Sequence, residues 1–197
     1  MKNSAQFLYR FRGWILGIFA ILLWLFPHSE KWIPASSILL ALVGIFIRIE
    51  ARRVIGNHSR GKEIAAPKLI TWGIYSRVRH PLYLSNICIC YAFTLFHLGW
   101  QIATFIFAGM VTLFVNFLAD SEEKFLQNQF GNDYLAWAEK TPKFIPKRKR
   151  NAEENETKSP AIRSIFSAIC SDVWTWIWLL FYTLLLLVRR NLELPIF

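Results

Sequence analysis

Five long apolar runs, nearly free of charged residues, constrain this chain more than any other feature. They cover residues 11–27, 33–47, 82–98, 100–118 and 173–188. Runs approaching ~20 residues are typical of transmembrane helices, and an open sheet could not satisfy its backbone hydrogen bonds in lipid. Tryptophans near the ends of the runs are typical of membrane interfaces: Trp14, Trp24, Trp32, Trp100 and Trp174. We therefore predict an all-α, polytopic membrane helix bundle of about five transmembrane helices.

The first apolar run follows Arg10 and Arg12, an arrangement that also occurs in secretory signal peptides. However, the run ends in Phe26-Pro27-His28, without the small residues of a cleavage site. We expect it to be retained as the first membrane helix.

Basic residues are distributed unevenly between the runs. The first two runs are joined by Pro27 to Pro34, and the third and fourth by His97-Leu98-Gly99, so both pairs read as helical hairpins. The basic residues instead follow the second and fourth runs: Arg48, Arg52, Arg53, Arg60, Lys62, Lys68, Arg77, Arg79, Lys143, Lys147, Arg148, Lys149 and Arg150. By the positive-inside bias, this side and the N-terminus face the cytoplasm, which predicts an integral protein of the inner (cytoplasmic) membrane. Arg189 and Arg190 fit badly, because they would lie on the opposite side.

The net charge of +10 has several readings. We expect anionic membrane lipids rather than nucleic acid as partners, because the charges flank apolar runs and no nucleic-acid motif accompanies them. The three cysteines, Cys88, Cys90 and Cys170, are odd in number and lie in apolar stretches. They predict neither a disulfide framework nor a metal site.

The chain divides into a core and a C-terminal addition. The fourth run continues with Phe125, Leu126 and Phe130 at helical spacing, so we expect a helix extension that enters the cytoplasm and stops near Gly131. Residues 1–146 form the predicted core, and residues 147–162 read as a flexible basic and acidic linker. Residues 163–197 would add a C-terminal transmembrane helix that packs on the bundle or supports a homo-oligomer.

The stretch 56–83 is polar and basic although it lies between two membrane runs. It contains Tyr75, Arg77, Arg79, His80 and Tyr83, and Pro81 allows a helix to begin directly after His80. The unpaired N–H groups of that helix start suit a ligand that carries a carboxylate. The alternative is structural: the basic residues would anchor to phosphate headgroups, and the tyrosines would be interfacial aromatics.

Several motifs together resemble a known enzyme family. They are Gly73-Ile74-Tyr75, Arg79-His80-Pro81-Leu82-Tyr83, Glu122-Glu123 and Phe130-Gly131-Asn132-Asp133-Tyr134. In this combination they resemble the isoprenylcysteine carboxyl methyltransferases and the related phospholipid methyltransferases. The likeness covers about residues 33–146.

The resemblance implies an S-adenosylmethionine site between the third run and the cytoplasmic end of the fourth. It places Pro67, Lys68, Leu69 and Ile70 on the adenine side. It assigns the rest of the cofactor to Tyr75, Arg79, His80, Pro81, Leu82 and Tyr83, with Glu122 meeting the ammonium or another polar group. S-adenosylmethionine carries a carboxylate, an ammonium and a sulfonium, so it needs donors, an acceptor and an apolar slot, which this segment offers.

One departure from the family bears on the acceptor. The prenylcysteine methyltransferases have a basic residue about one turn before the Glu pair, where this chain has Leu118. An apolar side chain cannot pair a substrate carboxylate. Asn116 and Asp120 share a helix face beside this position. They are the candidate catalytic residues, with Asp120 positioning or deprotonating the acceptor. The alternative is a solvated helix end.

These observations favour a methyltransferase that acts on a lipid-like or prenylated acceptor at the cytoplasmic face. A second enzyme reading is an NADPH-dependent membrane reductase of the sterol-reductase type, although the chain lacks a Gly-rich dinucleotide motif. A non-enzymatic scaffold or transporter is the third. A transporter would be expected to carry ionisable residues near the middle of the bilayer, whereas in this chain they gather at one surface.

Overall fold

The computed structural model describes residues 2–27, 33–55, 68–147 and 162–191, and within these ranges the only regular structure is helical. The elements are α1 (Lys2–Leu25), α2 (Ala35–Ile55), the 3₁₀ turn η2 (Gly73–Ser76), α3 (Pro81–Leu98), α4 (Ile102–Phe130), α5 (Asn132–Lys140), α6 (Ile165–Cys170) and α7 (Val173–Asn191). The prediction of an all-α membrane helix bundle is confirmed.

Among the described residues, three helices are long and apolar enough to cross a membrane: α3, α4 and α7. The other two expected spans are helical as well, but they differ from the expected runs. The run 33–47 forms only the first part of α2, whose last two turns carry Arg48, Glu50, Arg52 and Arg53. The run 11–27 is the second part of α1, which begins at Lys2.

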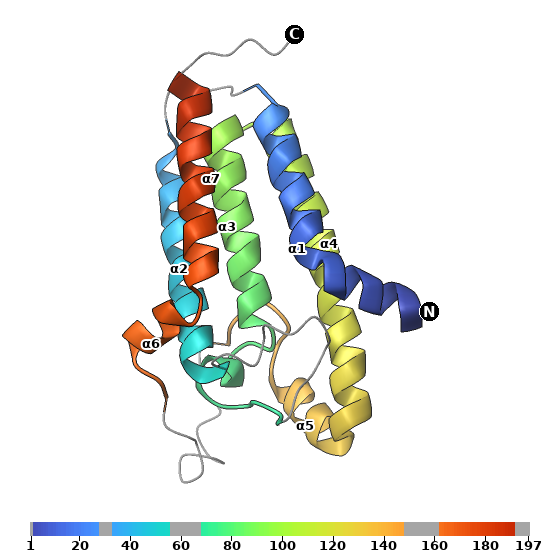
Figure 1. Ribbon diagram of the computed structural model, residues 1–197. Coiled ribbons are helices and arrows are strands. Elements are labelled where there is room, and N and C mark those ends of the chain that lie inside the picture. The colour runs from blue at the N-terminus through green and yellow to red at the C-terminus, as the bar shows by residue number, and fades with distance from the viewer. Residues whose placement is uncertain (1, 28–32, 56–67, 148–161, 192–197) are drawn as a thin grey trace.

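The long helices run side by side (Figure 1). In the bundle α3 packs against α2 on one side and α4 on the other, while α1 lies along α4 and α7 along α3. At the α2–α3 crossing, Ser85 Oγ donates to the Gly44 carbonyl at 2.8 Å. A Cβ at Gly44 would meet Ile89 Cγ1 at 2.8 Å, so this close approach requires glycine.

One end of the bundle gathers the basic and polar segments, and we call it the basic end. It holds the last turns of α2, η2, the start of α3, the end of α4, α5 and α6 (Figure 1). Helix α4 has 29 residues and is therefore about 44 Å long, against roughly 30 Å for a hydrocarbon core. The predicted helix extension is thus present, and it stops at Gly131, which has a φ of 53°.

At the opposite end, helix termini are joined by side chains. His97 Nε2 donates to the Phe26 carbonyl at 2.8 Å, which ties α3 to α1. Arg190 donates to the Phe96 carbonyl at 2.6 Å, near the C-terminus of α3, where the helix dipole favours a cation. Arg189 is buried as well. The two arginines that fit the charge bias badly are therefore packed against the bundle.

Candidate functional site

The segment from Tyr75 to His80 is held by backbone hydrogen bonds to the segment that follows α5. The N–H groups of Arg79 and His80 donate to the carbonyls of Pro142 and Lys143, at 2.9 and 3.2 Å. The N–H of Lys147 donates to the Arg77 carbonyl at 3.1 Å, and the Trp137 indole donates to the Tyr75 carbonyl at 3.2 Å. These bonds fix the loop that carries Tyr75, Arg79 and His80 against α5 and the segment after it.

Helix α3 begins at Pro81, directly after His80, as the sequence predicted. Proline suits this first helical position because its missing N–H would have had no partner there. The His80 carbonyl accepts the N–H of Leu84 at 2.9 Å, which starts the helical ladder. The His80 side chain is therefore fixed at the junction between the loop and the helix.

His80 and Arg79 converge on Glu123 of α4. One oxygen of Glu123, Oε1, lies 3.0 Å from His80 Nε2 and 3.0 Å from Arg79 Nε. Arg79 also donates to the Ala138 carbonyl at 2.8 Å. The imidazole of His80 is almost fully buried, and its ring centroid lies 5.5 Å from that of Tyr83.

Tyr134 of α5 adds a buried hydroxyl to this group. Its side chain is 3% exposed, and its hydroxyl has no hydrogen-bond partner within the part of the chain that the structure describes. Burial and the negative charge of Glu123 raise the pKa of Tyr134 to about 12, so the hydroxyl stays protonated. A protonated donor without a partner is available to a ligand. We call Arg79, His80, Glu123 and Tyr134 the α3–α4 cluster.

Tyr75 lies in η2 and is buried. Burial and the charge of Glu122 raise the pKa of its hydroxyl, while the charges of Arg52 and Arg48 oppose that rise. The Tyr75 hydroxyl is therefore within electrostatic reach of α4 on one side and α2 on the other. Glu122, the residue expected to meet the cofactor ammonium, also acts on Tyr134 through its charge.

The remaining predicted cofactor residues are spread along the same end of the bundle. Lys68 is exposed, with its ammonium 5.0 Å from the centroid of the Trp72 ring, and Leu69 and Ile70 are half-buried. Pro67 lies outside the described residues. Tyr83 belongs to an apolar cluster with Val111, Val115, Leu118 and Ala119 of α4, and Leu82 is half-buried beside it.

The predicted catalytic pair is linked by a lysine. Lys143 Nζ lies 2.6 Å from Asn116 Oδ1 and 2.6 Å from Asp120 Oδ1. Asn116 Nδ2 donates to Asp120 Oδ2 at 3.3 Å. Leu118, at the position of the family's basic residue, is 1% exposed within the apolar cluster.

The sequence reasoning missed Glu123, Tyr134 and Lys143. Glu123 could have been found from the buried row Val111, Val115 and Ala119, which continues at this position with a spacing of four residues. Tyr134 was quoted in the motif without a role, and only its burial shows that its hydroxyl matters. Nothing in the local sequence pairs Lys143 with Asn116 and Asp120, because the contact depends on how the segment after α5 folds back.

Comparison with known proteins agrees with these features. A family model described as phospholipid methyltransferase matches residues 32–133. The chain is similar to Methanethiol S-methyltransferase 1 of Bradyrhizobium diazoefficiens, with 30% identity over 95 residues, which are 48% of this chain and 32% of that relative. The match thus spans about a third of the relative's length. No solved structure matches the chain.

Proposed function

The chain belongs to the phospholipid methyltransferase family, and from this premise we propose that it uses S-adenosylmethionine to methylate a lipid-like or prenylated acceptor. It is an integral membrane protein, with three helices able to span a bilayer and the family's membrane methyltransferase domain. We place it in the inner membrane, with the basic end and the N-terminus in the cytoplasm, because basic residues concentrate at cytoplasmic ends.

The observation that supports this proposal best is the contact of His80 and Arg79 with Glu123, which lies 43 residues after His80 in the sequence. The group offers the Arg79 guanidinium, the His80 imidazole, a carboxylate and the Tyr134 hydroxyl, which has no hydrogen-bond partner among the described residues. These groups fit the polar part of S-adenosylmethionine, which carries both a carboxylate and an ammonium. The bound cofactor would supply a methyl group already activated by its sulfonium.

The chain's own residues would then bind, align and exclude water. Arg79, His80 and the N–H groups at the start of α3 would hold the carboxylate, and Glu122 and Glu123 the ammonium. Lys68, Leu69 and Ile70, with Pro67, would form the adenine side. Alignment of two reactants in a dry site can supply ~7–11 kcal/mol of the barrier reduction in favourable cases, so little further chemistry is needed.

We assign the acceptor side to Asn116 and Asp120, joined by Lys143. Both oxygens of the Asp120 carboxylate are engaged, one by Lys143 and one by Asn116, so it must exchange a partner before it can take a proton. We therefore expect Asp120 first of all to position the acceptor head, while the acceptor tail remains in lipid. Asp120→Asn should lower turnover more than it lowers cofactor affinity, and unchanged turnover would remove Asp120 from this role.

A small thiol is a second candidate acceptor, because a relative is named for methyl transfer to methanethiol. A thiol carries no carboxylate, so it does not need the basic partner that the apolar Leu118 cannot provide. The two acceptor classes differ in whether an apolar tail is required. Short and long thiols with the same reacting group would therefore separate them.

The test is a binding and transfer assay on detergent-solubilised full-length protein. Calorimetry should detect S-adenosylhomocysteine, and radiolabelled S-adenosylmethionine should label an acceptor among extracted membrane lipids, prenylated thiols or methanethiol. His80→Ala and Glu123→Gln should abolish most of the labelling, while Lys124→Gln, at the exposed neighbouring position, should not. No affinity for the cofactor or its demethylated product, or binding of NADPH in its place, would refute the proposal.

A further inference from the structure

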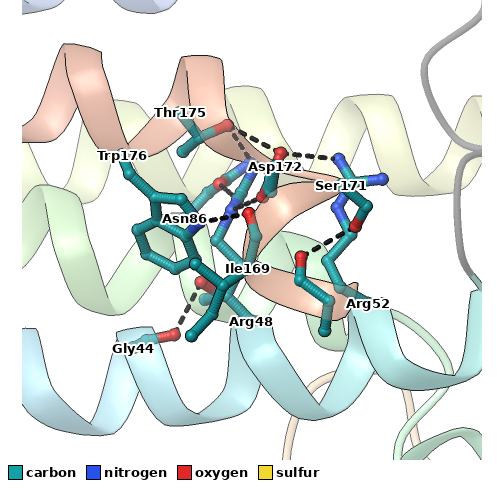
Figure 2. Close-up of polar contacts among 11 residues, drawn as sticks. Gly44, Arg48, Arg52, Asn86, Ile169, Ser171, Asp172, Thr175 and Trp176 are labelled. Atoms are coloured by element: carbon teal, nitrogen blue, oxygen red, sulfur yellow. Dashed lines mark hydrogen bonds and ion pairs between the residues drawn. The ribbon is translucent and has the colours of Figure 1, made fainter. Parts of the chain in front are cut away.

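A second group of buried charges lies at the basic end, outside the α3–α4 cluster. Asp172, which immediately precedes α7, is 1% exposed. Its Oδ2 lies 2.5 Å from Arg48 Nε, and its Oδ1 accepts a hydrogen bond from Arg52 at 3.0 Å. Figure 2 shows the carboxylate of Asp172 between the two arginines of α2.

The neighbouring polar groups complete this arrangement. Thr175 donates to Asp172 Oδ1 at 2.9 Å, and Arg48 donates to Thr175 at 3.1 Å and to Asn86 of α3 at 2.8 Å. We call Arg48, Arg52, Asn86, Asp172 and Thr175 the α2–α7 cluster. The Asp172 carboxylate joins α2 to the start of α7, and Arg48 extends the cluster to Asn86 of α3 (Figure 2).

The chain just before Asp172 strengthens the same contact. Arg53 Nε donates to the Arg163 carbonyl, and the Arg163 N–H donates to the Arg53 carbonyl, both at 3.1 Å. Helix α6 packs against α2. Residues 163–175 therefore hold the last two turns of α2, although they lie outside the region 32–133 that the family model matches.

Those last turns of α2 support the turn that carries Tyr75. Helix α2 contacts η2, and a Cβ at Gly73 would lie 2.5 Å from Val54 Cγ2, so the two elements are in close contact. Gly73 has a φ of 62°, which lets the chain make this approach. The charges of Arg52 and Arg48 also act on the Tyr75 hydroxyl. One helix thus connects Asp172 to the predicted cofactor turn.

We propose that Asp172 is a positioning residue for the cofactor-binding turn, which it orders by fixing Arg48, Arg52 and the end of α2. The residues expected to contact the cofactor all lie within residues 33–146, which resemble the family. Residues 163–175 would support that site from outside this region. The role of Tyr75 in cofactor binding rests on the proposed function, whereas the ordering of its turn does not.

Two readouts on full-length protein in detergent test this proposal. The first is hydrogen exchange of residues 73–80 without any ligand, and the second is affinity for S-adenosylhomocysteine. Asp172→Asn removes the charge and keeps the shape, so it should speed exchange in 73–80 and weaken affinity about tenfold. Asp172→Glu should restore part of both. Glu50→Gln, which removes the half-exposed Glu50–Arg53 pair on the same helix, is the matched control and should change neither.

A triple variant covers the case in which Asp172→Asn does not fold. Replacing the charges together, as Arg48→Met, Arg52→Met and Asp172→Leu, leaves no uncompensated buried charge and should keep the helices packed. We expect its cofactor affinity to stay well below that of the wild type, because apolar packing keeps the helices together but lacks the directional bonds by which Asp172 fixes Arg48 and Arg52. Wild-type affinity in this variant, or wild-type exchange in residues 73–80 of a folded Asp172→Asn, would overturn the proposal. Faster exchange in a protein whose wild type binds no cofactor would leave the positioning role intact and refute the proposed function instead.

Discussion

The two charged clusters at the basic end differ in how deeply the central carboxylate is buried and in how many partners it has. In the α2–α7 cluster one buried carboxylate meets two guanidinium groups and a hydroxyl. In the α3–α4 cluster Glu123 is 20% exposed, and the Tyr134 hydroxyl beside it has no hydrogen-bond partner among the described residues. A buried carboxylate with both oxygens engaged joins elements, whereas a part-exposed carboxylate beside an unbonded donor can take a ligand. We therefore expect changes in the first to affect mainly stability, and cofactor affinity only through the order of the Tyr75 turn, whereas changes in the second should affect activity directly.

The largest expected effect is on stability, from Asp172→Ala. This change leaves two buried guanidinium groups without their shared carboxylate, and breaking such a pair costs about 3–5 kcal/mol. Denaturant unfolding in detergent would measure it. Glu123→Ala is the matching change in the other cluster and should cost about 1 kcal/mol or less, because Glu123 is part-exposed. Equal losses in the two variants would contradict the comparison.

The next largest effect is on activity, from Glu123→Gln. This change keeps the size of the side chain and removes the charge that meets His80 and Arg79. We expect kcat/KM for methyl transfer to fall about 100-fold, or ~2.7 kcal/mol, with little change in unfolding. Steady-state kinetics measures this loss. Asp172→Asn, which also keeps the shape and removes the charge, is the counterpart in the α2–α7 cluster and should weaken cofactor affinity only about tenfold. A Glu123→Gln protein that is fully active but unstable would reverse the assignment.

Acid should weaken the α2–α7 cluster at a defined pH. Burial alone would raise the pKa of Asp172, but the charge and hydrogen bond of Arg48, the charge of Arg52 and the hydrogen bond of Thr175 outweigh it and lower the pKa to about 2. Because the folded pKa lies below the unfolded value of ~3.9, the stabilisation is present above pH ~4 and is lost as the pH falls toward 2, by roughly 2 kcal/mol. Unfolding measured from pH 5 to pH 2 should show this loss in the wild type. The same slope in Asp172→Asn would assign it to other groups.

The smallest expected effect comes from Tyr134→Phe. Removing a buried hydroxyl that has no partner within the described residues should leave stability unchanged or slightly higher. If the hydroxyl donates to the cofactor, affinity for S-adenosylhomocysteine should fall by ~1 kcal/mol, about fivefold. Calorimetry on the two proteins measures the difference. Trp137→Phe is the contrasting variant. It removes an indole N–H that already donates to the Tyr75 carbonyl, so it should lower stability.

The sequence predicted the helices well because their apolar runs carry a local signal. Pro81 and Gly131 marked the start of α3 and the end of α4, since each residue has a backbone property that suits its position. Helix α5 was not predicted as a separate helix. Its nine residues, Asn132–Lys140, are too few to show a long apolar period.

The pairing of charges was harder to predict than the helices. Neighbouring helix positions differ by about 100°, so the pattern did not separate Glu122 from Glu123 as the partner of His80. Arg48 and Arg52 were interpreted only as residues that set membrane orientation. Their partner Asp172 lies 124 and 120 residues further along the chain, and no local pattern reports a contact at that separation.

This separation also sets the order in which the protein can be completed during synthesis. The two arginines of α2 leave the ribosome more than a hundred residues before the aspartate that neutralises them. Until then their guanidinium groups remain hydrated or bound to lipid phosphate, because an unpaired charge is costly to bury. We therefore expect the end of α2 and the turn around Tyr75 to become ordered only after α7 has been synthesised.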